Sequence, residues 1–438
     1  MISIGRRHLL RGAGGLAIAP MFFNSLMAEE SNTASTNTIV VTIYLQGGND
    51  GINTVIPLGQ LKQYTTIRTP AAPPPGLALA YTETQLAPQA FDPNPATPVS
   101  GSSTYAFAPG MGSMRSLYAT GKLAVIAGVS LPLAEQNSLS HFNATEDWMT
   151  GQINITGAPP GWLGAALSGA SVGALGTVAS LNGTSLLISS ATDAGLVLST
   201  PISNFGPNYS TTDNYKSLEA TYKKLVNFTT TPKTAFAYQQ AVAQQALAAV
   251  ADVQSIAKKV PAKNYLTGYM KNYPIQPAWL DYQLQDVAQL IIGGAGIRGY
   301  FVQHSGFDTH SQQAMYQPLL LEQLSNSMQY FYSYLQAAGV SSNVLIMTIS
   351  DFGRRPQANL NFGTDHGSST VSFALGDMVT GGVFGSYPSL NPKNYDPNGN
   401  LKLTVDFRNV LSDVIQYLGG NPAPIIAPFA VPPKLGFI

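Results

Sequence analysis

The most informative absence from this 438-residue sequence is cysteine, which does not occur at all. Without thiols the chain can form no disulfides, has no thiolate ligands for a metal and has no cysteine nucleophile. Histidine is also scarce, with only five residues. Any chemistry that the chain performs must therefore use Asp, His, Ser and Thr side chains.

Charge is scarce as well, because Asp, Glu, Lys and Arg make up 10% of the residues and 22 basic side chains balance 22 acidic ones. A chain without a basic surface does not attract polyanions, so we expect no nucleic-acid partner. The 42 glycines and 30 prolines are typical of an exported protein with long polar loops. The 45% of hydrophobic residues suffices for the core of a large α/β domain.

Long apolar runs are missing from the main part of the sequence, so we expect no transmembrane anchor once the N-terminus has been removed. Arg6 and Arg7 precede a weakly apolar run from Gly12 to about Leu26, which is short for a membrane span. This order predicts a twin-arginine signal over residues 1–28 and a periplasmic or secreted protein. The alternative is an N-terminus that is basic by chance.

Continuous apolar and β-branched runs predict four buried strands, at Thr38–Leu45, Leu123–Val129, Arg298–Gln303 and Asn343–Ser350. A helix predicted within Ser311–Ala338 separates the last two strands. This alternation predicts an α/β fold with a doubly wound, mostly parallel sheet and helices on both faces, in one domain over residues 38–420. We expect a helical insertion at about 210–295 and a loop in the Pro-rich stretch from Gly59 to Ser103.

Ionisable residues that directly follow a parallel strand are candidates for a site, because ligands bind beyond the carboxyl ends of such strands. Asp50 follows the first predicted strand in a glycine-rich turn, where an Asx-turn is the alternative role. His304, Asp308 and His310 follow the third. Imidazole and carboxylate groups suit zinc, manganese or iron, although these residues could instead cap the helix that begins near Ser311.

Two further candidate groups lie near the fourth predicted strand. Asp351 follows this strand directly, and Arg354 and Arg355 come next. An arginine pair suits a phosphate, sulfate or carboxylate group, and a surface ion pair with Asp351 is the alternative. In the segment GTDHG, His366 can ligate a metal while Asp365 ligates beside it or holds its imidazole. A solvated turn is the alternative there.

His141 has Ser138 and Ser140 as neighbours, which places candidate nucleophiles beside a candidate base. With His8 in the predicted signal, the other four histidines all lie in glycine- or serine-rich segments that also contain acidic residues. Histidines of a hydrophobic core would be scattered differently. The pattern therefore favours one shared polar site.

Several short motifs occur along the chain in a fixed order: VVTIYLQGGNDGINTVIPL, SHF, GWLG, GFDTH, SDFGRR, GTDHG, GGVFG and DFRNVL. Together with the twin-arginine start, they resemble bacterial exported proteins of domain-of-unknown-function family 1501, over the chain to about Gly420. That family is similar to the alkaline phosphatase and sulfatase superfamily. In that superfamily an α/β sheet carries aspartates and histidines around one or two divalent metals.

The resemblance implies a metal site for one or two ions such as zinc or manganese. Its implied ligands are Asp50, Asp308, His310, Asp351, Asp365 and His366. The implied nucleophile is Ser138 or Ser140, of which Ser140 is preferred, and the residues themselves add His141 as the base beside it and Arg354 as the group that holds the anion. Phe352 departs from the superfamily, which has a histidine there. The implied activity is hydrolysis or transfer of phosphate or sulfate esters, and the alternative is a non-catalytic binding or assembly protein with an exported partner.

Overall fold

A computed structural model describes much of the chain from residue 37 to residue 438. It leaves out residues 70–72, 97–103, 133–138, 154–156, 158, 171–174, 182, 184, 191–194, 199, 203–219, 221–222, 225, 228–236, 262, 274–275 and 427–432. The predicted signal, residues 1–28, and Ser138 lie outside the described residues, as does much of the N-terminal half of the predicted insertion.

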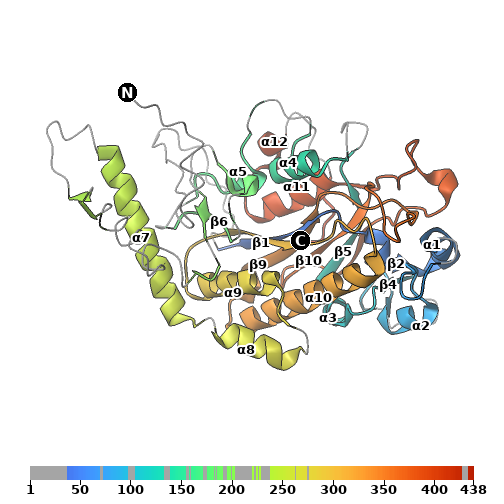
Figure 1. The fold of residues 1–438 in the computed structure, drawn as a ribbon. Helices are drawn as coiled ribbons and strands as arrows, with labels where there is room; N and C mark the ends of the chain where they lie inside the picture. The colour runs from blue at the N-terminus through green and yellow to red at the C-terminus, as the bar shows by residue number, and fades with distance from the viewer. Residues whose placement is uncertain are drawn as a thin grey trace.

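A nine-stranded sheet forms the centre of the molecule (Figure 1). Its spatial order is β11 (Gly382–Gly385), β5 (Leu123–Ser130), β10 (Thr370–Leu375), β9 (Val344–Ser350), β1 (Ile39–Gln46), β8 (Gly299–Ser305), β6 (Val178–Ser180) and β7 (Leu196–Val197), with β12 (Val405–Asp406) beside β5. Strand β10 is antiparallel to β5 and β9, and the other described pairings in this sheet are parallel. The predicted α/β class with a mostly parallel sheet is confirmed.

The strands β9, β1 and β8 are adjacent and parallel, and their ends are in register. Leu45 of β1 lies opposite Ser350 of β9 on one side and His304 of β8 on the other. The loops that follow these three strands therefore begin at the same edge of the sheet, which is where ligands bind in parallel α/β folds. All four predicted strands are present, with ends shifted by one or two residues.

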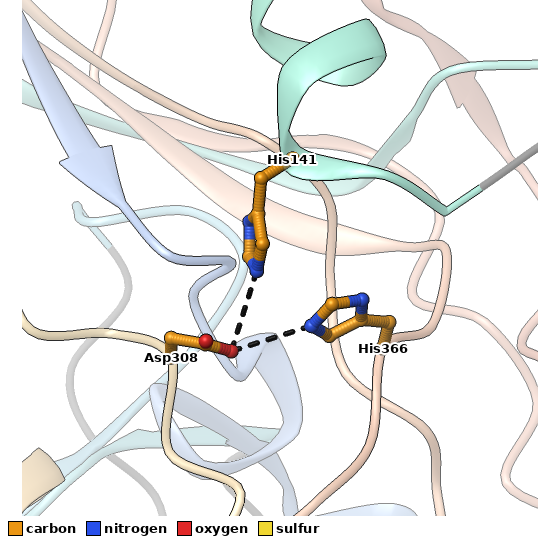
Figure 2. Close-up of side chains that lie close together, drawn as sticks. All are labelled: His141, Asp308 and His366. Carbon is orange, nitrogen blue, oxygen red and sulfur yellow. Dashed lines mark hydrogen bonds and ion pairs between the residues drawn. The ribbon is translucent and has the colours of Figure 1, made fainter.

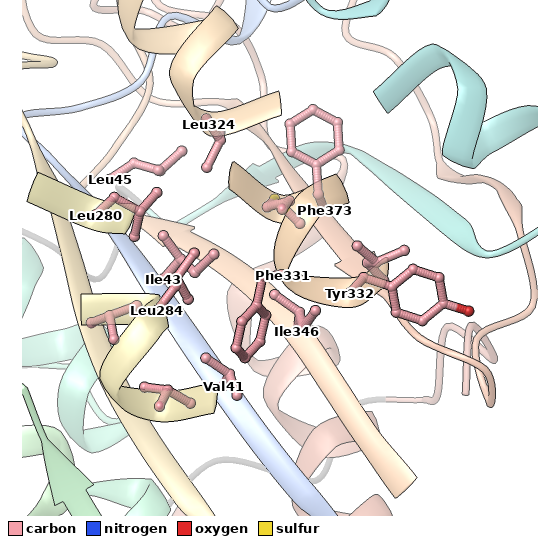
Figure 3. Close-up of a cluster of buried hydrophobic side chains, with 14 of the residues drawn as sticks. Val41, Ile43, Leu45, Leu280, Leu284, Leu324, Phe331, Tyr332, Ile346 and Phe373 are labelled. Atoms are coloured by element: carbon pink, nitrogen blue, oxygen red, sulfur yellow. The ribbon is translucent and has the colours of Figure 1, made fainter. Parts of the chain in front are cut away.

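The residues of β1 alternate between two hydrophobic cores, because successive side chains of a strand point to opposite faces. Val41, Ile43 and Leu45 pack into one core, and Val40 and Tyr44 into the other. Figure 3 shows the first core, where side chains of β1 meet those of α9 and α10. Full burial of one such Val, Leu, Ile or Phe side chain contributes about 1.5–3 kcal/mol.

Helices cover both faces of the sheet, as predicted (Figure 1). One face carries α3 (Gly112–Ala119), α9 (Trp279–Ile292) and α10 (Gln313–Ala337), and α8 (Lys263–Asn272) contacts α9. The other face carries α4 (His141–Thr150), α5 (Trp162–Ala166), α11 (Phe407–Tyr417) and α12 (Pro422–Ile425). The Ala/Gln-rich helix of the predicted insertion is α7 (Ala237–Lys259), which packs on α9.

The stretch from Gly59 to Ser103 is more ordered than the sequence suggested. It contains α1 (Leu61–Arg68), α2 (Glu83–Leu86) and β3 (Ala90–Phe91). Strand β3 joins β4 (Tyr105–Phe107) and β2 (Val55–Pro57) in a second, three-stranded sheet. The expectation of a plain loop was wrong because elements of two to eight residues between prolines give almost no periodic signal.

Short 3₁₀ helices complete the described elements: η1 (Gly51–Asn53), η2 (Leu58–Gln60), η3 (Ala87–Gln89), η4 (Leu186–Ile188), η7 (Ser341–Asn343) and η8 (Pro392–Asn394). Of these, η1 matters for the site because Asp50 is its N-cap residue. Among the described residues, none of the helices combines the length and the apolar character needed to cross a membrane.

Candidate metal centre

Six ionisable side chains from four separate segments meet at the edge where β8 and β9 end. His141 is the first residue of α4, and Asp308 and His310 lie in the loop between β8 and α10. The others are Asp351, directly after β9, and Asp365 with His366 from the GTDHG segment. Contacts join all six into one network. Sequence analysis placed all six at or near a site, with His141 as a base rather than a ligand.

The closest group consists of His141, Asp308 and His366 (Figure 2), whose ligand atoms lie within 4.8 Å of one another. Oδ1 of Asp308 is 3.4 Å from Nε2 of His141 and 3.3 Å from Nε2 of His366. Around a tetrahedral zinc ion bound at about 2.0–2.1 Å, neighbouring ligand atoms are about 3.3 Å apart. The spacing therefore fits a single metal ion.

His310 offers a fourth donor beside this group. Its Nε2 lies 3.2 Å from Oδ1 of Asp308 and 2.9 Å from Nε2 of His366. The imidazole is held between two neighbours in the chain, because Asp365 meets its Nδ1 at 3.2 Å while His366 meets its Nε2. Asp365 thus supports His310, and not the adjacent His366 as the sequence suggested.

Each of the three imidazoles has an oxygen atom at its Nδ1. The partner is Oδ2 of Asp351 for His141, Oδ1 of Asp365 for His310, and the carbonyl of Leu139, at 2.8 Å, for His366. Carboxylates and carbonyls accept hydrogen bonds, so these partners favour the tautomers with the proton on Nδ1. This outer set of acceptors is the usual arrangement behind histidines that bind a metal through Nε2.

The same assignment leaves the three Nε2 lone pairs converging on a carboxylate oxygen. Acceptors that face each other repel unless a cation or a proton lies between them. One of these atoms, Nε2 of His141, makes no hydrogen bond, and neither does Oδ1 of the fully buried Asp351. Unpaired buried polar atoms are costly. A divalent ion with N and O ligands, such as zinc, satisfies the donor set best.

The pKa shifts of Asp308 and His366 also favour a metal site. Burial raises the pKa of Asp308, but the hydrogen bond and positive charge of Arg354 outweigh it and lower the pKa to about 2. Burial lowers the pKa of His366. Asp308 is therefore a carboxylate and His366 a neutral imidazole at neutral pH, the forms that bind metals. The hydrogen bond with Asp351 raises the pKa of His141, so protons compete with a metal for this residue more strongly than they do for His366.

The glycines around Asp365 and His366 allow close packing of the loop. A Cβ atom on Gly363 would lie 2.3 Å from the backbone of His310, and one on Gly367 would lie 2.4 Å from the backbone of Arg354. Real Cβ atoms do not approach so closely, so only glycine fits at either position. The two glycines thereby bring His366 against His310 and Arg354. This close packing explains why glycines flank the Thr-Asp-His sequence.

Arg354, expected to hold an anionic group, has a different set of partners. It is 1% exposed and donates to Oδ1 of Asp308 at 2.6 Å. Its remaining hydrogen bonds go to the backbone carbonyls of Gly47, Gly48, Phe307 and Thr364. The guanidinium therefore ties three loops together and balances the charge of Asp308, and its hydrogen bonds are directed at the protein itself.

Asp50, expected to be a ligand, lies in a separate buried network. Its Oδ1 is 2.6 Å from Nη2 of Arg68 and accepts a hydrogen bond from the amide of Ile52, and its Oδ2 accepts from Gln313 at 2.5 Å. Asp50 starts at the expected edge of the sheet, but as the cap of η1 it turns toward α1. Both of its oxygens are occupied, so the structure does not bring it to the metal centre.

The remaining predicted residues flank the centre or lie apart from it. Ser140 is half-buried, immediately precedes His141, and makes no side-chain hydrogen bond to cap α4. His304 is buried, with its Nε2 at the carbonyl of Leu320. Sequence analysis missed Asn359, whose amide donates to Asp365 and to the carbonyl of His310. No local signal marks such a residue, since one partner is a backbone carbonyl distant in the chain and the other, Asp365, is reached only when the loop turns back on itself.

Comparison with known proteins supports the family but adds no activity. None of the curated proteins matches this sequence. A family model described as a protein of unknown function, DUF1501, matches residues 37–400, which include the candidate metal centre and every strand of the central sheet except β12, while α11 and α12 lie beyond the match. The chain belongs to the DUF1501 family.

Proposed function

We propose that this chain is an exported, metal-dependent hydrolase or transferase that acts on phosphate or sulfate esters. The observation that carries the proposal is the convergence of three imidazole Nε2 atoms on Oδ1 of Asp308 at the carboxyl edge of a parallel sheet. The motifs shared with exported relatives of the alkaline phosphatase and sulfatase superfamily support the substrate class. The paired arginines of the N-terminus support export to the periplasm or beyond.

The side chains divide into three roles. His141, Asp308 and His366 would hold the ion, with His310 as a fourth donor. A bound divalent ion polarises an ester oxygen and lowers the pKa of a bound water. Asp351 and Asp365 orient the imidazoles of His141 and His310 through Nδ1. Ser140, at the start of α4, is the candidate nucleophile for transfer.

The anionic part of the substrate needs a cationic partner other than Arg354. Arg355 follows Arg354 in the chain and is only half-buried. The pKa of Asp365 is lowered mainly by the hydrogen bond from Asn359, and the charge of Arg355 makes a smaller contribution. We assign to Arg355 the anion-binding role that was predicted for the arginine pair. The other part of the substrate could contact the aromatic ring of Phe142, which follows His141 in the chain and is 78% exposed. Aryl esters are therefore the first substrates to assay.

The test begins with metal analysis of protein purified without chelators. We expect about one zinc or manganese ion per chain and turnover of aryl phosphates or aryl sulfates that stops when a chelator removes the ion. His366→Ala should lose both the ion and turnover, whereas Ser140→Ala should keep the ion and lose transferase activity. A protein that binds neither zinc nor manganese, and that turns over no ester when either metal is supplied, contradicts the proposal.

A second candidate function is a non-catalytic binding or assembly protein with an exported partner. The occupied guanidinium of Arg354 favours it, because a site for anionic esters commonly offers an unpaired arginine. Under this alternative, the wild-type protein binds metal but turns over none of the esters. Metal content and turnover measured on one preparation therefore separate the two functions.

A further inference from the structure

A chain of buried hydrogen bonds joins Asp50 to the loop that carries Asp365 and His366. The hydroxyl of Thr364 donates to Oε1 of Gln313 at 2.6 Å, and Nε2 of Gln313 donates to Oδ2 of Asp50 at 2.5 Å. Asp50 in turn pairs with Arg68. All four side chains are at most 1% exposed. The network begins with the ion pair between Asp50 and Arg68 and ends at Thr364, the residue before Asp365.

The direction of each hydrogen bond in this chain is determined by its neighbours. A carboxylate only accepts, so Gln313 must present its amide nitrogen to Asp50, and the second amide hydrogen is used by Gln317 at 2.7 Å. The Oε1 atom of Gln313 then faces Thr364, whose hydroxyl must donate. No other arrangement satisfies Asp50, Gln313 and Thr364 together, and buried side chains that satisfy one another in this way hold each other in place.

The backbone of Thr364 is fixed at the same place. Its amide donates to the carbonyl of Thr309 at 3.1 Å, and its carbonyl accepts from Nη1 of Arg354 at 2.9 Å. Thr364 is thus held through its side chain by the Asp50 network and through its backbone by two segments that belong to the metal centre. His366 follows two residues later, too close for its position to vary independently.

We propose that Asp50, Gln313 and Thr364 form a positioning network for the metal centre, an inference that rests on the proposed metal site. Asp50 acts as the anchor of the loop and not as a ligand. Outer partners of this kind change metal affinity by about 10- to 100-fold when they are lost, although they never touch the ion. The loop should therefore lose its fixed position when the Thr364 hydroxyl is removed.

The decisive comparison uses Thr364→Val and Thr364→Ser. Valine keeps the shape but removes the hydroxyl, and serine restores it. Thr348→Val is the matched control, because Thr348 is also buried, lies within β9, and uses its hydroxyl oxygen to accept from the amide of Phe373. We expect Thr364→Val to bind Zn²⁺ about tenfold more weakly. Thr364→Ser and the control should stay within about twofold of the wild type, since both keep the Thr364 hydrogen bond.

A second measurement does not depend on the metal. The amides of Asn361, Phe362, Gly363 and Thr364 are all hydrogen-bonded, so their hydrogen exchange reports whether the loop is held. In metal-free protein, Thr364→Val should exchange these amides faster, and the serine variant should not. If Thr364→Val fails to fold, Gln313→Met interrupts the same chain from the α10 side.

The possible outcomes separate this inference from the proposed function. Wild-type protein that binds no zinc rejects the metal site, while the exchange rates still decide whether the network holds the loop. Normal zinc affinity and normal exchange in Thr364→Val overturn the positioning role. Equal losses in Thr364→Val and Thr348→Val also overturn it, because the effect would then be general destabilisation.

Discussion

Two aspartates that follow neighbouring parallel strands have opposite environments. Asp50 comes after β1 and Asp308 after β8, and the two strands end in register. Asp50 is buried, and Arg68 and Gln313 occupy its oxygens. The side chain of Asp308 is 49% exposed and faces imidazoles as well as Arg354. A position at the carboxyl edge of the sheet makes an aspartate a candidate ligand. The turn that follows the strand and the cation beside the aspartate then determine whether its carboxylate is free to bind an ion.

The largest expected effect is on stability. Asp50→Ala leaves the guanidinium of Arg68 buried without a counter-charge, which should lower the free energy of unfolding by about 3–5 kcal/mol. Asp308→Ala also removes the carboxylate partner of a buried guanidinium, that of Arg354, but backbone carbonyls still accept hydrogen bonds from Arg354 and the lost carboxylate is half exposed, so the loss should be smaller. Urea unfolding of the metal-free variants measures both values. Equal losses would mean that the two aspartates differ less than their surroundings indicate.

The next effect is on metal affinity, and two histidines sharpen the comparison. His366→Ala removes a candidate ligand and should weaken zinc binding by more than about 100-fold, beyond the loss expected for an outer partner. His304→Ala alters a buried histidine outside the cluster and should leave zinc affinity unchanged, although stability falls. Competition with a fluorescent chelator gives both affinities. If the His304 variant loses as much zinc affinity as the His366 variant, the metal does not bind at the cluster that contains His366.

The smallest effect concerns a buried carboxyl that, unlike Asp50, has no arginine beside it. Burial raises the pKa of Asp281 to about 7, and the hydrogen bond from the Ala278 amide opposes this only in part. The folded state therefore holds the proton more tightly than the unfolded state. The resulting stability is complete below about pH 4 and is lost as pH rises toward 7, at up to about 1.4 kcal/mol per pH unit.

Asp281→Asn removes this titration and keeps an oxygen for the amide of Ala278. Between pH 5 and pH 7, the free energy of unfolding of the wild type should fall by about 2 kcal/mol relative to the variant. Burial lowers the pKa of His304 to about 4, which makes both proteins lose stability as pH falls below about 6.5, so this contribution cancels. Parallel pH profiles would show that Asp281 stays ionised in the folded protein.

The strands and the long helices were predictable because their signals are local. The runs that became β1, β5 and β9 are largely apolar or β-branched over seven or eight residues, β8 contains the shorter apolar run YFV, and α10 has a clear helical period. Strand β10 was missed. It has the mixed composition TVSFAL and is antiparallel to its neighbours, so the expected alternation of parallel strands and helices did not predict it.

The site was predictable in its members but not in its contacts. Asp308, His310, Asp351, Asp365 and His366 were expected together because they follow strands or lie in tight glycine-bounded turns. The bond between Asp365 and His310, and the burial of Arg354 by four carbonyls, depend on segments that meet only in three dimensions. Residue type and spacing carry no information about backbone acceptors such as that of Leu139.

The imidazole of His366 rests on the carbonyl of Leu139, 227 positions earlier in the chain. A nascent or proteolysed polypeptide that stops before this histidine therefore lacks one of the candidate ligands. Binding of the proposed ion would have to wait until synthesis has passed His366 and the sheet has closed. Limited proteolysis between α4 and β9 should accordingly release any bound ion, even where most of the hydrophobic interior survives.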